Sequence, residues 1–218
     1  GDGHIDLVVA NYNPDGSRML DSTDQSGMEV MMGSWARATN GGKTRLLLNN
    51  AGNPGLQFDE VEGALSHDAA HGWAFAAAAA DLDGDMLPEI YLVHDWGADC
   101  LLHNRSTPGK LSFAELKGRR SITAPRSMTI GLDTFNGMGV EFADLNRDGH
   151  VDIIVSNITS DYFLHQSTLV QIATGNLEQM ANGFAPFVNR SETLGLSRGG
   201  WAWDTKLGDF DNDGILEV

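Results

Sequence analysis

A nine-residue pattern occurs three times in this chain, and each copy has oxygen-bearing side chains at its positions 1, 3, 5 and 9. The copies begin at Asp81, Asp144 and Asp209, which are 63 and 65 residues apart. Alternate residues of a tight loop can direct their side chains at one centre, and calcium takes six to eight oxygen ligands in flexible geometry. The pattern therefore predicts calcium-binding loops in a repeat protein.

The expected ligands of each loop are the four side chains and the backbone carbonyl of position 7. Glycine at position 6 permits the positive φ that turns the chain, but Met86 holds this position in one loop, which we expect to be strained or weaker. A fourth copy at the start of the sequence shows only its second half. The predicted calcium ligands are Asp2, His4 and Asp6; Asp81, Asp83, Asp85, Leu87 and Glu89; Asp144, Asn146, Asp148, His150 and Asp152; and Asp209, Asp211, Asp213, Ile215 and Glu217.

Two other calcium motifs do not fit the pattern. An EF-hand loop requires Glu at position 12, where this chain has Val9, Leu92 and Val155. The calcium repeats of β-helices recur at short intervals with paired glycines, unlike these widely spaced copies. The simplest alternative is that Asp–Gly pairs only mark β-turns. Three copies with the same oxygen positions favour calcium over that alternative.

Composition limits the classes of partner. The 218-residue chain is 41% hydrophobic, which is enough for a buried core, and its net charge is −16. Such acidity argues against nucleic-acid binding and against anionic membranes. Thirteen of the thirty acidic residues lie in the four loops. The single cysteine, Cys100, can form no disulfide within the chain, and no apolar run is long enough to insert into a membrane.

The sequence around the loops also repeats. Gly72-Trp-Ala-Phe75 and Gly200-Trp-Ala-Trp203 precede two loops, and β-rich runs follow three of them. A third element reads Arg45–Asn50, Cys100–Asn104 and Tyr162–Gln166, and a fourth centres on Phe58, Phe113 and Phe187. Helical periodicity is nearly absent, with one weak helix candidate at 168–182. Four short strands per unit of about sixty residues predict the blade of a β-propeller.

The predicted fold is an all-β, partial β-propeller of four-stranded blades, with a calcium loop between the first two strands of each blade. Because propellers usually have four to eight blades, we expect the chain to be a fragment whose further blades come from the rest of the protein or from another chain. The expected blades are 1–62 (lacking the first strand), 72–117, 137–190 and the start of the next at 200–218, with insertions at 11–43, 117–136 and 167–183.

These motifs resemble the FG-GAP or VCBS repeat propellers, the family that includes the integrin α-subunit head. The Gly-Trp-Ala entry, Arg45-Leu-Leu-Leu-Asn-Asn50 and Phe58-Asp-Glu-Val61 are most similar to proteins with ASPIC and UnbV domains, such as cartilage acidic protein and bacterial secreted relatives. The resemblance implies a secreted or cell-surface, calcium-stabilised propeller used in adhesion, recognition or as a scaffold. Loops of this kind suit millimolar extracellular calcium, so we expect export, with the periplasm as an alternative.

Propeller topology also predicts where a ligand binds. Insertions 11–43 and 117–136 should project from the face opposite the calcium loops, and 167–183 from the calcium side. Four basic residues lie within ten positions, and they predict a protein or glycan partner that is anionic. The alternative is that these charges only keep an acidic protein soluble. The residues of this predicted ligand face are Lys117, Arg119, Arg120 and Arg126.

Three weaker candidates remain. His67 and His71 have a zinc-compatible spacing but no glutamate after the first histidine. Trp73, Trp201 and Trp203 could stack on sugars, although core packing is the more common role of such residues. Asn104, Asn157 and Asn189 begin glycosylation sequons. No catalytic constellation is recognised, so we expect no enzyme. The rivals are a calcium-dependent polysaccharide lyase-like propeller and a propeller lectin.

Overall fold

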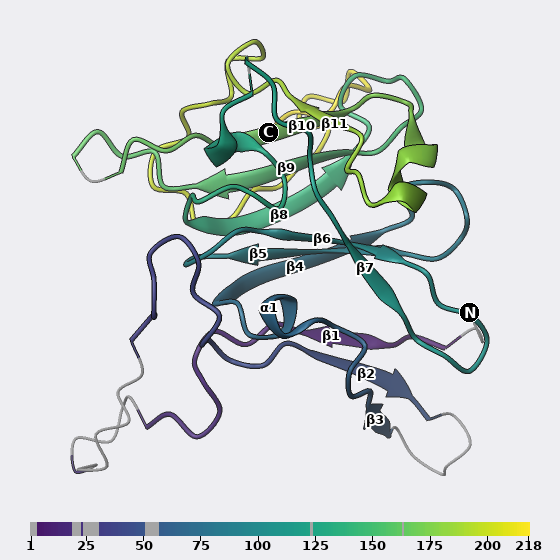
Figure 1. Ribbon diagram of the computed structural model, residues 1–218. Coiled ribbons are helices and arrows are strands. Elements are labelled where there is room, and N and C mark those ends of the chain that lie inside the picture. The colour runs from purple at the N-terminus through teal and green to yellow at the C-terminus, as the bar shows by residue number, and fades with distance from the viewer. Residues whose placement is uncertain (1–3, 19–22, 24–30, 51–56, 123, 163) are drawn as a thin grey trace.

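The computed structural model describes residues 4–18, 23, 31–50, 57–122, 124–162 and 164–218. The described residues form three antiparallel sheets that follow one another along the chain (Figure 1). The first sheet contains β1 (Leu7–Val9), β2 (Arg45–Asn49) and β3 (Phe58–Glu60). The second contains β4 (Ala74–Ala80), β5 (Glu89–His94), β6 (Cys100–Asn104) and β7 (Phe113–Leu116). The third contains β8 (Gly137–Ala143), β9 (Asp152–Asn157), β10 (Leu169–Ala173) and β11 (Phe187–Asn189).

Each sheet is a meander in which consecutive strands pair, as in the predicted blades. Helical structure in the described residues is limited to α1 (His67–Ala70) and the short 3₁₀ turns η1 (Arg126–Met128) and η2 (Leu177–Asn182). The chain thus has an all-β, partial propeller-like fold, which confirms the predicted fold class. No helix in the described part of the chain is long and apolar enough to cross a membrane.

The two central strands of the middle sheet, β5 and β6, are buried on both faces, which fits their largely apolar sequences. On β5, Tyr91 and Val93 enter a core shared with the third sheet, whereas Ile90 and Leu92 enter a core shared with the first. This alternation follows from the two-residue period of a strand. Packing of successive sheets face to face is the arrangement expected for neighbouring blades.

Hydrogen bonds join the three sheets at the end remote from the loops between β4 and β5 and between β8 and β9. The Tyr12 hydroxyl donates to Asp95 Oδ2 at 2.6 Å, and Asn136 Nδ2 donates to Asp95 Oδ1 at 2.8 Å. Asn136 in turn accepts a bond from Gln166 Nε2. These residues come from the β1–β2, β5–β6, β7–β8 and β9–β10 connections, so insertions 11–43 and 117–136 do meet on this face.

The third strand of the third sheet is not where the sequence suggested. The prediction of a strand at Tyr162–Gln166 is wrong, because the described residues of this segment form no strand. The strand β10 is formed by Leu169–Ala173 instead. It lies inside the predicted insertion 167–183 and inside the helix candidate 168–182. Both segments are apolar enough for a strand, but only the second pairs with β9 and β11. The extra residues are divided between the β9–β10 connection and the β10–β11 connection, which contains η2.

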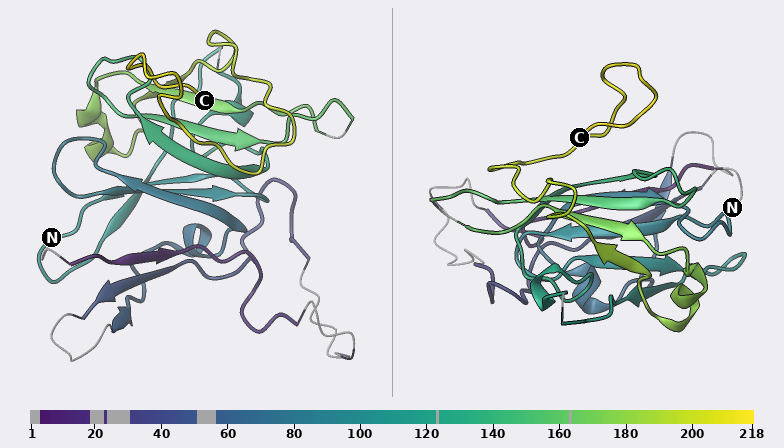
Figure 2. Two further views of the ribbon diagram at one scale, coloured as in Figure 1. Left: turned by 180° about the vertical axis from the view of Figure 1, so that it is seen from behind. Right: turned by 90° about the horizontal axis from the view of Figure 1, so that it is seen from above.

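Residues 200–218 form isolated bridges and no full strand. The bridges are Ile158↔Trp201 and Gly208↔Glu217. In the second and third sheets the first strand pairs with position 9 of the loop and with the residues after it. Figure 2 shows this C-terminal segment, in yellow, projecting from the side of the third sheet.

Candidate metal-binding loops

The three described copies of the nine-residue pattern are loops with the same closing pair. Loop 81–89 joins β4 to β5 and loop 144–152 joins β8 to β9, and the residue before each loop pairs with its position 9. These pairs are Ala80↔Glu89 and Ala143↔Asp152. Gly208↔Glu217 closes loop 209–217 in the same way.

The loops also share their backbone conformation. Positions 4 and 6 both have positive φ in all three copies. The prediction for position 6 is confirmed, and Met86 adopts this conformation without being glycine, at a cost of about 1–2 kcal/mol for an L-residue. Nothing in the sequence indicated the positive φ at position 4, because two of the three residues at that position are not glycine. The φ values are 83° and 68° for Gly84 and Met86, 60° and 85° for Arg147 and Gly149, and 62° and 82° for Asn212 and Gly214.

Backbone N–H groups hold the loop carboxylates in place. The position 1 carboxylate accepts the N–H of position 6, and the position 5 carboxylate accepts the N–H of position 7, in every described loop. An ionised carboxylate has about four lone-pair sites, so each retains acceptor capacity for a cation. The six bonds are Met86 to Asp81 (3.0 Å), Gly149 to Asp144 (2.8 Å), Gly214 to Asp209 (2.9 Å), Leu87 to Asp85 (2.7 Å), His150 to Asp148 (2.9 Å) and Ile215 to Asp213 (2.7 Å).

The position 9 carboxylate connects the loop to the sheet. One oxygen of Glu89 accepts the N–H of Leu82 in its own loop at 2.9 Å, and the other accepts the N–H of Asn104 on β6 at 3.1 Å. Asp152 repeats this arrangement with Leu145 (2.9 Å) and Ala173 on β10 (2.8 Å). Both carboxylates are fully buried. The sequence did not reveal the bond to the third strand, because the donor is a backbone group remote in the chain.

Burial also affects the ionisation of position 9. Loss of solvation raises the pKa of Glu89 to about 7, the charges of Asp83 and Asp85 add to this, and the two backbone bonds oppose it. Burial similarly raises the pKa of Asp152. A cation bound in the loop would favour the ionised form of both groups.

Side-chain oxygens converge in two of the three described loops, as metal ligands require, whereas the carboxylates of loop 144–152 form no such group among the described residues. Asp209, Asp211, Asp213 and Glu217 each offer an oxygen within 4.8 Å of the others, and so do Asp81, Asp83 and Asp85. In loop 144–152, Asn146 Nδ2 donates to Asp148 Oδ2 at 2.9 Å. The loops also touch, since the Arg147 guanidinium donates to the carbonyl of Gly214.

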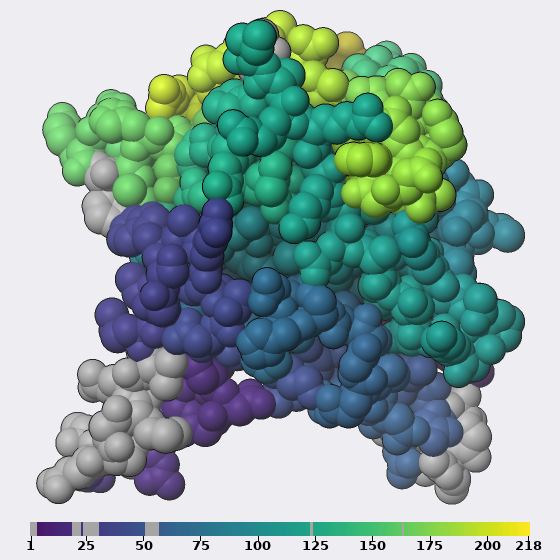
Figure 3. Space-filling view, viewed as in Figure 1, coloured from purple at the N-terminus to yellow at the C-terminus, as the bar shows by residue number. Residues whose placement is uncertain are grey.

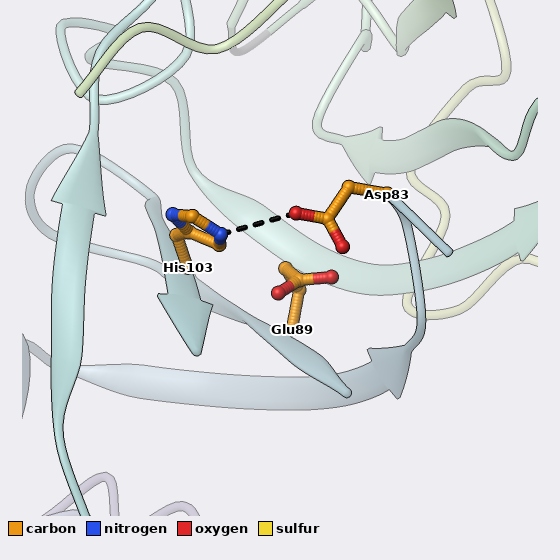
Figure 4. Close-up of side chains that lie close together, drawn as sticks. All are labelled: Asp83, Glu89 and His103. Atoms are coloured by element: carbon orange, nitrogen blue, oxygen red, sulfur yellow. Dashed lines mark hydrogen bonds and ion pairs between the residues drawn. The ribbon is translucent and has the colours of Figure 1, made fainter. Parts of the chain in front are cut away.

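A further group combines the second loop with the third strand of its sheet. Asp83, Glu89 and His103 bring ligand atoms within 4.8 Å of one another (Figure 4). The spacing within the loop gave no indication of His103, because this residue lies on β6, fourteen residues after the loop ends. The structure also places Asp6 beside the first sheet, where it accepts the N–H of Asn49 at 2.9 Å. The predicted ligand Asp2 lies outside the described residues, and His4 is exposed.

The predicted ligand-face residues Lys117, Arg119, Arg120 and Arg126 are all exposed. Their segment runs along the outer edge of the third sheet, because Lys117 pairs with Phe184 and the Arg119 guanidinium lies 4.4 Å from the Phe184 ring centre. The segment was expected to project from the face opposite the acidic loops, and it lies instead along the edge of the third sheet. A cavity of about 590 Å³ lies between this segment and β11. Figure 3 shows segment 117–130 (teal) against the region around η2 (lime).

The remaining candidates gain little support. The rings of His67 and His71 stack with centroids 4.5 Å apart, and within the described part of the chain they belong to no cluster of three metal-ligating side chains. Trp73 is buried, as core packing requires, whereas Trp201 and Trp203 are about half exposed and stack at 6.3 Å.

The successive antiparallel sheets with acidic loops define a class, that of β-propeller-like repeat proteins. A family model adds detail: residues 81–155 match an FG-GAP-like repeat. The match begins at one acidic loop, continues through the second sheet and ends in the strand after the next loop. It supports the FG-GAP part of the resemblance. No curated protein shows significant similarity to the chain.

Proposed function

We propose that this chain is a calcium-binding propeller repeat region of a secreted or cell-surface protein, with a role in adhesion, recognition or scaffolding. The observation that carries the proposal is the repeated loop geometry: positive φ at positions 4 and 6 and the same carboxylate-to-backbone bonds in three copies. A repeated backbone of this kind suits a hard cation that accepts irregular oxygen coordination, and carboxylate oxygens converge in loops 81–89 and 209–217.

Calcium in these loops would be held by the side chains of positions 1, 3, 5 and 9 and the carbonyl of position 7. Loop 209–217 supports this best, because its four carboxylates converge. Those like charges repel one another at short range, and a divalent cation offsets the repulsion. The bound ion would fasten each loop to the two strands that it joins, so that metal affinity contributes to folding stability.

Calorimetric titration with calcium tests this proposal. The expected result is two or more sites, with one site weakened in Asp211→Asn, which removes one charge at nearly constant shape and gives this loop the asparagine that Asn146 provides at position 3 of loop 144–152. Asp161→Asn is the matched control, since Asp161 is exposed and lies outside the loops. Absence of calcium binding in the unmodified chain would contradict the proposal.

The recognition role is supported by the cavity beside the basic segment. Arg119 and Arg190 line it together with the amide side chains of Gln171, Gln179 and Asn189. The buried Nδ2 of Asn189 has no hydrogen-bond partner in the structure. Guanidinium groups pair with carboxylates and sulfates, and amides bond hydroxyl groups. We therefore propose an anionic glycan or an acidic protein segment as the ligand, in an otherwise acidic chain.

Binding to immobilised sulfated and uronic-acid oligosaccharides tests the recognition role. Reversal of charge in Arg119→Glu/Arg120→Glu should abolish binding, whereas Lys110→Glu, an exposed change of the same kind outside the cavity, should not. Equal binding by both variants would remove the ligand proposal. Turnover of the oligosaccharide would instead indicate the lyase-like rival. Export and the closer relationship to ASPIC and UnbV proteins remain part of the proposal, on the strength of the sequence motifs.

A further inference from the structure

His103 makes the second loop chemically different from the others. Its Nε2 lies 3.1 Å from Asp83 Oδ2 at position 3 of loop 81–89. Figure 4 shows the imidazole of His103 and the carboxylates of Asp83 and Glu89 turned toward one another. His103 is 6% exposed and Glu89 is fully buried, so a nitrogen and two carboxylates meet in a largely dry site.

The other two sheets provide an internal comparison. The pairs Leu7↔Leu47, Ile90↔Leu102 and Ile153↔Gln171 place one residue of the neighbouring strand (β2, β6 or β10) opposite position 9 of each loop. Hydrogen bonds identify the same three opposing residues. In each sheet, the residue that follows the opposing residue donates its backbone N–H to the position 9 carboxylate. These opposing residues are Leu48, His103 and Ile172. Histidine therefore replaces an aliphatic side chain in the second sheet alone among the three.

A nitrogen ligand changes which cation a site prefers. Calcium binds oxygen almost exclusively, whereas imidazole is a good ligand for zinc and neighbouring divalent transition metals. Zinc bonds to nitrogen and oxygen of about 2.0–2.2 Å in tetrahedral geometry place neighbouring ligand atoms about 3.3–3.6 Å apart. His103 Nε2 and Asp83 Oδ2 lie 3.1 Å apart, so a small separation of the two atoms would accommodate the ion.

We propose that loop 81–89 is a mixed nitrogen and oxygen site for a zinc-type divalent cation, with Asp83, Glu89 and His103 as its ligands, whereas loops 144–152 and 209–217 bind calcium. The inference rests on the proposed function in one respect, namely that these loops bind cations. It adds that the cations differ between loops. Met86 at position 6 is a second departure of this loop from the calcium pattern of its neighbours.

Arg105 lies on the far side of the imidazole. Its Nε is 3.4 Å from His103 Nδ1, and its Nη2 donates to the carbonyls of Met180 and Ala181 in η2. Metal on Nε2 requires the proton of the neutral ring to be on Nδ1, so the long contact with Arg105 Nε is given up. The two bonds from Nη2 keep the guanidinium anchored to the third sheet. Zinc binding at His103 is therefore expected to alter the contact between the second and third sheets only locally.

The simpler explanation is a hydrogen bond from His103 to Asp83 without a metal. In that case His103 stabilises the loop, but zinc gains no preference for it. The two explanations make opposite predictions for zinc binding in the presence of saturating calcium, and the aliphatic residues of the other sheets suggest the variant that separates them. His103→Leu installs the side chain that the first sheet carries at this position.

The experiment is equilibrium dialysis of the metal-stripped protein against zinc in excess calcium, with both metals counted. Unmodified protein should retain one zinc ion, and His103→Leu should bind it at least tenfold more weakly while keeping its calcium. His165→Leu, an exposed histidine outside the loops, should behave as the unmodified protein. Cobalt in place of zinc adds a spectroscopic readout, since loss of the nitrogen ligand shifts its visible absorption.

Three results would overturn the proposal. Calcium bound without zinc contradicts the mixed site and leaves the proposed function intact. Zinc bound equally by His103→Leu and by the unmodified protein contradicts the role of His103. Neither metal bound contradicts both proposals. A melting curve of His103→Leu shows whether the variant is folded. If it is not folded, the cobalt spectrum of the unmodified protein shows whether a nitrogen ligand binds the metal.

Discussion

The carboxylate of Asp152 accepts the backbone N–H of Ala173 at 2.8 Å, and this bond ties loop 144–152 to the third strand of its sheet. Glu89 and Asp6 make the equivalent bonds to Asn104 and Asn49. Position 9 therefore organises the sheet whether or not a cation is present. Positions 1, 3 and 5 bond mainly to their own loop, so their contribution to stability should depend much more on the metal.

Asp152→Ala should destabilise the protein both in calcium and in chelator. The substitution leaves the N–H groups of Leu145 and Ala173 without their acceptor in a buried site, which costs about 1–3 kcal/mol for each unsatisfied group. Denaturant titration in both conditions measures the change. Asp148→Ala is the control, because its carboxylate at position 5 is exposed and its loss in chelator should change the free energy of unfolding little. Equal effects of the two variants in chelator would contradict a structural role for position 9.

Asp211→Ala should lower the melting temperature in calcium and have a smaller or opposite effect in chelator. The oxygen of Asp211 lies within 4.8 Å of those of Asp209, Asp213 and Glu217, so it is both a candidate ligand and a source of repulsion. Losing one ligand reduces the stabilisation that binding gives to the folded state. Thermal melting in the two conditions checks this expectation. Unchanged melting in both conditions would refute a structural role for the loop cation.

Met86→Gly should stabilise the protein by up to about 1 kcal/mol. Glycine adopts the φ of 68° without the steric cost of an L-residue, and this relief exceeds its extra chain entropy. Met86 is 84% exposed, so little apolar burial is lost. Chemical denaturation measures the difference, and Leu87→Gly, next to it but without positive φ, should destabilise. Destabilisation by Met86→Gly would mean that the residue is not strained.

Asp133→Asn should stabilise the protein at pH 8 more than at pH 4. Asp133 Oδ2 accepts the N–H of Asp99, its Oδ1 has no partner, and the Tyr91 hydroxyl donates to Asp99 Oδ2. Burial raises the pKa of Asp99 to about 7 and raises that of Asp133 well above its usual value, with the charge of Asp99 adding to the latter. Groups with raised folded-state pKa values favour folding when protonated, so their cost appears as the pH rises from about 4.

Melting curves in chelator at the two pH values test this expectation without any contribution from cations bound in the loops. Above the folded-state pKa values the cost is constant, so the gain from Asp133→Asn should reach a plateau. Each kcal/mol corresponds to about 2–4 °C for a chain of this size. Asp161→Asn, at an exposed site, should show no such dependence. A larger gain in melting temperature at pH 4 than at pH 8 would show that ionisation of this buried pair does not destabilise the folded protein.

Local patterns in the sequence predicted much of the fold. The apolar runs at Glu89–Val93 and Asp152–Ser156 became β5 and β9 because both faces of these strands are buried, and the loops were marked by their own acidic residues. The predicted position of the third strand in the third sheet was wrong, because Tyr162–Gln166 and Leu169–Ala173 are both plausible strands. Only pairing with β9 decides between them. Local propensity carries no information about that choice.

The candidate site was only partly predictable for a related reason. Side chains at positions 1, 3, 5 and 9 could be read from their spacing, whereas His103 and the N–H donors Asn104 and Ala173 reach the loops through strand pairing. The positive φ of Arg147 was hidden because a residue other than glycine adopts it, held by the bonds of the loop. Contacts distant in sequence became visible only once the strand register was known.

The most direct test of cation binding by the loops is the melting temperature of the protein in millimolar calcium and in chelator, with bound metal counted in the same samples. We expect a rise of many degrees in calcium together with two to three bound ions, because binding to the folded state alone adds to its stability. A sharp transition at the same temperature in both conditions, with no metal bound, would contradict the central claim that these loops are cation sites.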